Sequence, residues 1–294
     1  MPILNKKQEP RSKRQEVRTG SVLASCLLLL ASVTHAQDAQ TLVSQMQGAE
    51  RSVSYAAVRK SGGDTIRVFR SGLKQRLEWL SPDVRRGDVQ VDDGEHVTLY
   101  HRAEKSATQT DSPSRALAFA ATGTPAKTTF AGRSAFSVQV GAKRTLVIDA
   151  QTKALLAVRG GVGNGGFALS DIRFAPVPAS KFEFVAPSSV SVQKFPGALY
   201  NNVKIAKRAA RWLQTPFKPP AGFSFESAIV SNDSAWLRYS NRQNRISLFE
   251  QPTTAGDLPP QKVKGGTFWR KNGVRFLATG SPGSALGQVV NDLK

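Results

Sequence analysis

The sequence predicts a mainly β fold (α+β), in which a curved antiparallel sheet is followed by a smaller α+β part. Apolar residues alternate with polar or charged residues through most of the chain, which is the pattern of half-buried strands. Turn signals such as Gly62-Gly63-Asp64 and Asp92-Asp93-Gly94-Glu95 separate these segments, so neighbouring strands should be joined as hairpins. A chain of 294 residues is long enough for two domains.

Residues 1–36 are typical of a signal peptide. A basic segment precedes an apolar run from Val22 to Val33, and Thr34-His35-Ala36 places small residues at both positions of a cleavage site. The alternative is a membrane anchor, but the run is short for a hydrocarbon core of ~30 Å. We therefore expect export with cleavage near Ala36.

Cys26 fits the letters of a lipoprotein box, but it lies within the apolar run instead of after it. We expect no lipid on this residue, with lipidation as the alternative. Since Cys26 is the only cysteine, the mature chain should contain no disulfide.

The net charge is +20, from 41 Lys and Arg against 21 Asp and Glu. Such a balance predicts attraction to anionic surfaces, such as lipid headgroups, lipopolysaccharide or an acidic partner. No nucleic-acid motif is present and the chain should be exported, so we expect no nucleic-acid partner. A solvated basic surface without a specific target is the alternative.

The predicted first domain, residues 37–187, begins with an amphipathic helix over Asp38–Glu50, in which Leu42, Val43 and Met46 share one face. Ser112-Pro113 is a helix start, and the helix should reach about Ala121. About nine strands are expected, near Val53–Ala57, Ile66–Val68, Leu73–Trp79, Val89–Val91, Val97–Tyr100, Ala135–Val140, Thr145–Ile148, Ala154–Arg159 and Phe167–Phe174.

Residues 188–216 differ in composition and predict a basic linker with a short helix. Its apolar face would carry Val203, Ala206, Ala209 and Leu213. The opposite face would contact an anionic surface or partner through Lys204, Lys207, Arg208 and Arg211.

The predicted second domain, residues 217–294, is small. Strands are expected over Phe223–Phe249 and in a hairpin around Asn272-Gly273, followed by a helix from Ser284. A domain of this size is marginally stable alone, so it should lean on the first domain or on a partner.

The sequence carries no catalytic or metal-binding motif. The mature chain has two histidines, His96 and His101, and it lacks HExxH, GxSxG and a P-loop lysine. Gly161, Gly163 and Gly166 spell GxGxxG, but the next residues predict a strand instead of the helix that a pyrophosphate site requires. We therefore expect a flexible hairpin loop there, and no enzyme activity, cofactor or metal.

Several segments resemble the superfamily of the lipoprotein carriers LolA and LolB and of RseB. They are Arg76–Pro82, Gly87–Val89, Asp93-Gly94, Val97–Tyr100, Gly132–Phe136, Ile148-Asp149 and Ser170–Phe174 with Pro176, Pro178 and Phe182. Four later segments resemble the small domain of the MucB/RseB regulators, which the carriers lack: Pro220–Phe223, Tyr239-Ser240, Ile246–Glu250 and Thr279–Pro282. One turn, Asn241–Arg245, differs from the acidic, glycine-containing turn expected of these regulators.

The resemblance covers nearly the whole mature chain and implies a half-open barrel with a helical plug over an apolar cavity. It implies a periplasmic protein that binds a membrane-spanning anti-sigma factor, shields it from proteolysis, and is released by acyl groups of lipids or lipoproteins in an envelope stress response. The inward residues that would line the acyl cavity are Tyr55, Leu77, Trp79, Val97, Leu99, Phe136 and Val138.

For each of these residues, a place in the ordinary core is the alternative. A second function is a LolA-like carrier or chaperone of lipoproteins or lipids, and a third is an envelope scaffold that holds an anionic polymer by charge. The second domain and the basic linker favour the regulatory sensor.

Overall fold

The computed structural model describes residues 38–112, 119–160, 166–215, 219–220, 222–241, 243–280 and 283–292. The predicted signal peptide, Cys26, most of the helix expected after Ser112 and residues 161–165 of the glycine-rich loop lie outside the described residues. Within them, no helix has the length and apolar character needed to span a membrane.

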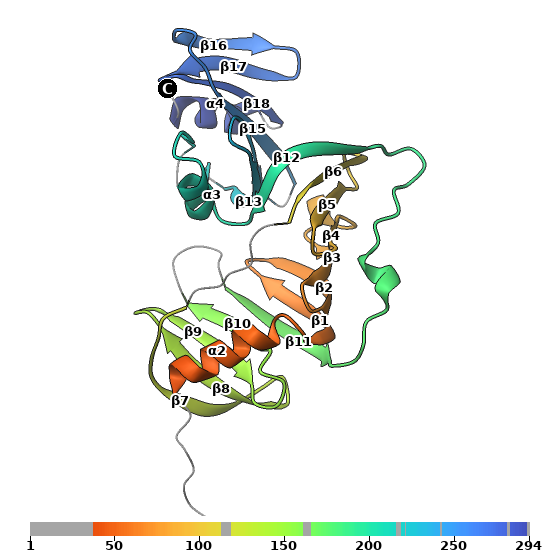
Figure 1. The fold of residues 1–294 in the computed structure, drawn as a ribbon. Coiled ribbons are helices and arrows are strands. Elements are labelled where there is room, and N and C mark those ends of the chain that lie inside the picture. The colour runs from red at the N-terminus through yellow and green to blue at the C-terminus, as the bar shows by residue number, and fades with distance from the viewer. Residues whose placement is uncertain are drawn as a thin grey trace, which may run out of the picture. The chain divides into compact units, whose positions relative to one another are not determined.

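The mainly β prediction is confirmed: 18 strands of the described residues join in one sheet (Figure 1). The strands up to residue 173 are β1 (Ser54–Ser61), β2 (Asp64–Ser71), β3 (Lys74–Ser81), β4 (Val89–Asp92), β5 (His96–His101), β6 (Ser106–Asp111), β7 (Ala121–Phe130), β8 (Arg133–Val140), β9 (Arg144–Asp149), β10 (Leu155–Gly160) and β11 (Phe167–Arg173). The later strands are β12 (Val192–Tyr200), β13 (Ser224–Val230), β14 (Ala235–Ser240), β15 (Arg245–Pro252), β16 (Leu258–Val263), β17 (Gly266–Lys271) and β18 (Val274–Gly280).

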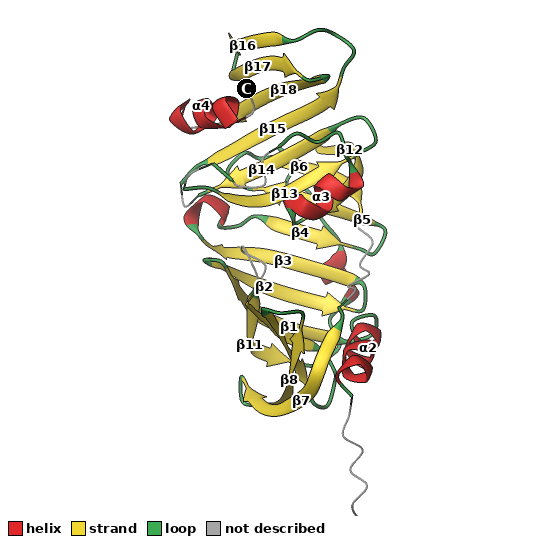
Figure 2. Ribbon diagram, turned by 90° about the vertical axis from the view of Figure 1, so that its left-hand side faces the viewer, coloured by secondary structure: helices red, strands yellow, loops and turns green. Residues whose placement is uncertain are grey.

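Strand pairing follows the chain closely. From one edge to the other the order is β7, β8, β9, β10, β11, β1, β2, β3, β4, β5, β6, β12, β13, β14, β15, β18, β17, β16. Among these described pairs, β6–β12 is parallel and the others are antiparallel. Figure 2 shows how β12 to β18 continue the sheet beyond β6.

The predicted first helix is confirmed as α2 (Ala39–Ala49). Asp38 caps it, because its Oδ2 accepts the backbone N–H of Thr41 at 3.1 Å. Leu42, Val43 and Met46 are buried and pack against apolar residues of β8, β9 and β10. The apolar face of the helix therefore covers one face of these strands (Figure 1).

Residues 188–216, predicted as a linker, contain β12 as well as the expected short helix, α3 (Val203–Ala209). Pro196 and Gly197 interrupt the alternation in β12, and this hid the strand from sequence analysis. The apolar face of the helix was partly mispredicted. Ala206, Ala210 and Leu213 are buried, whereas Ala209, the last residue of the helix, is exposed.

Two helices cover one face of the later strands. The expected C-terminal helix is present as α4 (Gly283–Asp292). Side chains of α3 and α4 pack on one face of β13–β15, β17 and β18, against a core that includes Leu237, Leu248, Trp269 and Phe276. Two short 3₁₀ turns complete the described elements, η1 (Asp83–Arg85) and η2 (Ala179–Phe182).

Candidate functional site

The seven residues predicted to line an acyl cavity lie in three separate clusters. Tyr55, Leu77 and Trp79 pack together on β1–β3 with Ile66, Val68 and Leu169. Val97 and Leu99 pack with Leu199 and Ile229, residues of β12 and β13. Val138, with Phe136 beside it, packs beneath α2. Phe136 is half-buried and the other six are buried, so each cluster is closed in this structure.

Trp79 has polar partners at one end of its ring. Its Nε1 donates to Oδ2 of Asp64 at 3.0 Å, and the Arg85 guanidinium lies 4.1 Å from its ring centroid. Arg85 also donates to Asp64, at 2.7 Å. These contacts fix the indole at the end of its apolar cluster, next to the charged residues described below.

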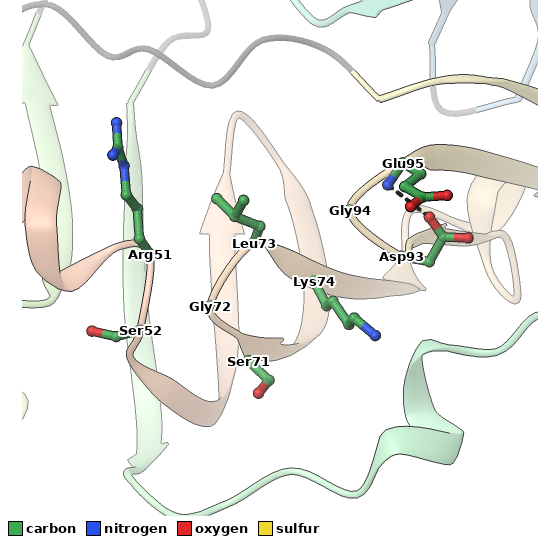
Figure 3. Close-up of a pocket in the computed structure, with 9 residues that line it drawn as sticks. All are labelled: Arg51, Ser52, Ser71, Gly72, Leu73, Lys74, Asp93, Gly94 and Glu95. Carbon is green, nitrogen blue, oxygen red and sulfur yellow. Dashed lines mark hydrogen bonds between the residues drawn. The ribbon is translucent and has the colours of Figure 1, made fainter.

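A pocket of about 440 Å³ lies at three turns, away from the predicted acyl residues (Figure 3). Its lining comes from the α2–β1, β2–β3 and β4–β5 connections: Arg51, Ser52, Ser71, Gly72, Leu73, Lys74, Asp93, Gly94 and Glu95. Two basic and two acidic side chains balance its charge, and Leu73 is its one large apolar side chain. The lining therefore suits a polar group better than an acyl chain.

A buried network of ion pairs connects β3–β6 with β13–β15, and sequence analysis missed it. At its centre, Glu226 of β13 is surrounded by three arginines: Arg245 Nε at 3.2 Å, Arg85 Nε at 3.4 Å and Arg238 Nε at 3.8 Å. The side chains of Glu226 and Arg238 are 3% and 2% exposed, which places both charges in the interior.

The same arginines reach the earlier strands. Arg245 pairs with Asp88, beside the start of β4, and Arg238 pairs with Glu104 of the β5–β6 turn. Asp88 Oδ2 also lies 3.2 Å from Nδ1 of His101. We call Arg85, Asp88, Glu104, Glu226, Arg238 and Arg245 the ion network.

The network shifts the pKa values of Glu226 and Asp88, and its arginines also act on the neighbouring His101. Burial opposes ionisation of Glu226, but the charges of Arg85, Arg245 and Arg238 outweigh it and lower the pKa of Glu226 from 4.5 to about 2. Burial of Asp88 is likewise outweighed by its hydrogen bond to His101 and by Arg245, so its pKa is lowered. Burial and the charge of Arg238 lower the pKa of His101, which favours the neutral imidazole at pH 7.

The turn that differs from the one expected of the MucB/RseB regulators takes part in this network through its last residue. Arg245, the last residue of that turn, forms ion pairs with both Glu226 and Asp88. The sequence offered one usable signal. Arg238 lies on the same face of its strand as Trp236, and the other face of that strand is apolar.

The four basic residues predicted to meet an anionic surface lie on α3 or just after it. Lys204, Arg208 and Arg211 are exposed. Lys207 is half-buried, and its Nζ donates to the backbone carbonyl of Thr215 at 2.6 Å. Three of the four are therefore accessible to a partner, while Lys207 holds the segment after the helix.

Comparison with known proteins gives matches among solved structures. Neither protein-family models nor curated proteins match this sequence. A crystal structure of MucB is 17% identical, with 88% of this chain and 98% of that chain covered and a TM-score of 0.43. The MucA/MucB complex from Pseudomonas aeruginosa is 16% identical, with 86% and 97% covered and a TM-score of 0.38. A LolA superfamily protein from Nitrosomonas europaea is 7% identical, with 83% and 91% covered and a TM-score of 0.18.

Proposed function

We propose that this chain is a periplasmic regulatory sensor that binds the periplasmic part of a membrane anti-sigma factor and releases it when acyl chains bind. The observation that carries the proposal is the extension of the sheet from β12 to β18, with its own helices and core. In the family that the sequence resembles, a second part of this kind separates the regulators from the carriers. A carrier has no need of it.

The ion network supports regulation, because it gives a physical route between the two parts. A ligand shifts an equilibrium between two arrangements only by its different affinity for them. Buried ion pairs stabilise one arrangement strongly, since separating them leaves uncompensated charge. Displacement of Trp79 by a ligand would disturb Asp64 and Arg85, and through Arg85 the carboxylate of Glu226.

The acyl site that we propose is the cluster of Tyr55, Leu77 and Trp79. Burial of each methylene contributes ~0.8 kcal/mol, so a 12-carbon chain could contribute on the order of 8–10 kcal/mol before entropy costs. The chain would have to open a cluster whose members pack against one another in the described structure.

The test uses the exported, full mature chain. Pull-down with the periplasmic region of the anti-sigma factor from the same genome should recover a complex, and native mass spectrometry of the purified protein should detect bound lipid. Lipid without a complex would contradict the sensor function and favour the LolA-like carrier. Neither lipid nor complex would contradict both functions.

A further inference from the structure

One face of the later sheet carries a row of large apolar side chains across four neighbouring strands. Trp236 of β14 lies opposite Phe249 of β15, Phe249 lies opposite Leu277 of β18, and Leu277 lies opposite Phe268 of β17. The rings of Trp236 and Phe249 are stacked at 5.5 Å with planes 11° apart. We call these four residues the apolar row.

The apolar row lies on the face away from the helices. Its neighbours along the strands, such as Leu237, Leu248 and Trp269, are buried in the core beneath α3 and α4. Because side chains of a strand alternate between faces, the row points the other way. Trp236 is partly covered, because it packs against the cluster of Val97, Leu99, Leu199 and Ile229 and against Phe195. All four members of the row are large, apolar and half-buried, so each keeps an accessible part on this face. The accessible parts of these side chains offer apolar contacts to a partner.

Two arginines flank this row. Arg270 of β17 and Arg275 of β18 lie directly opposite each other, two residues from Phe268 and Leu277 on the same face. Like charges in this position destabilise a sheet. Arg275 donates to Oε1 of Gln251 at 2.9 Å, whereas Nε of Arg270 is buried without a hydrogen-bond partner in the described structure. Among the described residues, no carboxylate forms an ion pair with either arginine.

We propose that the apolar row and this arginine pair form the docking surface for an acidic segment of the protein partner, which places carboxylates on Arg270 and Arg275 and apolar side chains on the row. The inference rests on the proposed function and assigns its partner contact. Charge complementarity commits it to an acidic occupant, because the pair is a local excess of positive charge in a chain of net charge +20. Trp and Arg are also the residues that contribute most to protein interfaces.

The docking surface is distinct from the basic face of α3. Lys204, Arg208 and Arg211 are exposed without a row of aromatic rings between them, as suits a lipid surface or a solvated helix. An acidic protein segment needs both the charges and the apolar contacts, and those occur together on β14, β15, β17 and β18.

The experiment measures binding of the fluorescently labelled periplasmic region of the anti-sigma factor to the full mature chain at low and high salt. The test variants are Arg270→Glu combined with Arg275→Glu, and Arg275→Glu alone, which alters only an exposed side chain and should fold. The matched control is Arg208→Glu combined with Arg211→Glu, which makes the same charge change on α3. Circular dichroism and thermal unfolding confirm folding of each protein.

We expect the double variant to bind at least about tenfold more weakly, Arg275→Glu to bind several-fold more weakly, and the control to stay within about twofold of wild type. Wild-type binding that both test variants retain would overturn the docking surface and leave the proposed function standing. No binding by the wild type would overturn the proposed function itself.

Two further outcomes would also overturn the docking surface. In the first, vesicles containing phosphatidylglycerol bind the double variant more weakly than wild type while the labelled anti-sigma region binds both equally, which would make the arginine pair a lipid contact. In the second, sedimentation shows that the wild type is a dimer and the double variant a monomer, which would make the face a contact between copies.

Discussion

At the scale of single residues, the pKa values of two buried carboxyl groups are shifted in opposite directions. Glu250 is 1% exposed, lies on the helix-covered face of the later sheet, and accepts the backbone N–H of Gln214 at 2.8 Å. Burial raises the pKa of Glu250 from 4.5 to about 7, and the hydrogen bonds from Gln214 and Thr215, with the charge of Lys207, offset this only in part. Glu226 has the opposite shift, because three arginines surround it.

Glu250→Gln should remove a pH dependence of stability. Since the folded protein holds the proton of Glu250 more tightly than the unfolded chain, stability is greatest below pH 4.5 and falls as the pH rises towards 7. At pH 8 the variant should gain about 2–3 kcal/mol in the free energy of unfolding, with no gain at pH 4. Urea unfolding across this pH range measures it. The exposed Glu183→Gln is the control, and a variant curve parallel to wild type would contradict the assignment.

Glu226→Gln should weaken the protein at neutral pH. The lowered pKa means that ionised Glu226 stabilises the fold above pH 4.5, and that this contribution is lost as the pH falls towards 2. At pH 7 the variant should lose about 3–5 kcal/mol, because three buried arginines lose their shared partner. Thermal unfolding at pH 7 and pH 3 tests this. An equal loss at both values would show that packing, and not charge, explains the effect.

At the scale of elements, β12 is the join between the two parts of the sheet. It pairs with β6 on one side and with β13 on the other. Gly197 in this strand has φ +116°, and a Cβ there would overlap the carbonyl of Val230. The carbonyl of Gly197 also accepts a hydrogen bond from Oγ1 of Thr110. A side chain at this position would therefore disturb both neighbouring strands.

Gly197→Ala should destabilise the protein more than Gly94→Ala. Gly94 has a similar φ of +102°, but nothing lies within 4 Å of its added Cβ, so it controls for backbone strain of about 1–2 kcal/mol. The overlap at Gly197 should lower the free energy of unfolding by at least about 2 kcal/mol more. Denaturant unfolding of the two variants measures the difference, and equal values would mean that β12 tolerates the side chain.

Elements with strong periodicity could be predicted from the sequence, and weakly patterned ones could not. α2, the β4–β5 hairpin and the β17–β18 hairpin have clear apolar faces or turn residues, and the structure contains them. β6 is rich in Ser, Thr and Ala, and β7, β12 and β16 contain proline. β7 and β16 are the two edges of the sheet, where a strand tolerates proline because one side of its backbone is unpaired.

At the scale of the whole molecule, the ion network joins segments that are distant in sequence. Arg238 and Glu104 are 134 residues apart, and Arg245 and Asp88 are 157 apart. No local period marks such pairs, so sequence analysis identified the acyl candidates by parity and missed these charges. The alternation of apolar residues shows which face of a strand is buried, but not which strands pack against one another. The seven candidates share this alternation and still lie in three separate clusters.

The central claim is that an acyl ligand weakens binding of the protein partner. The most direct measurement is the Kd of the full mature chain for the periplasmic region of the anti-sigma factor as a synthetic diacylated lipopeptide is titrated in. Linkage predicts that the Kd rises with lipopeptide and then levels off, by about tenfold or more at saturation. A Kd that stays constant while native mass spectrometry shows the lipopeptide bound would contradict the account.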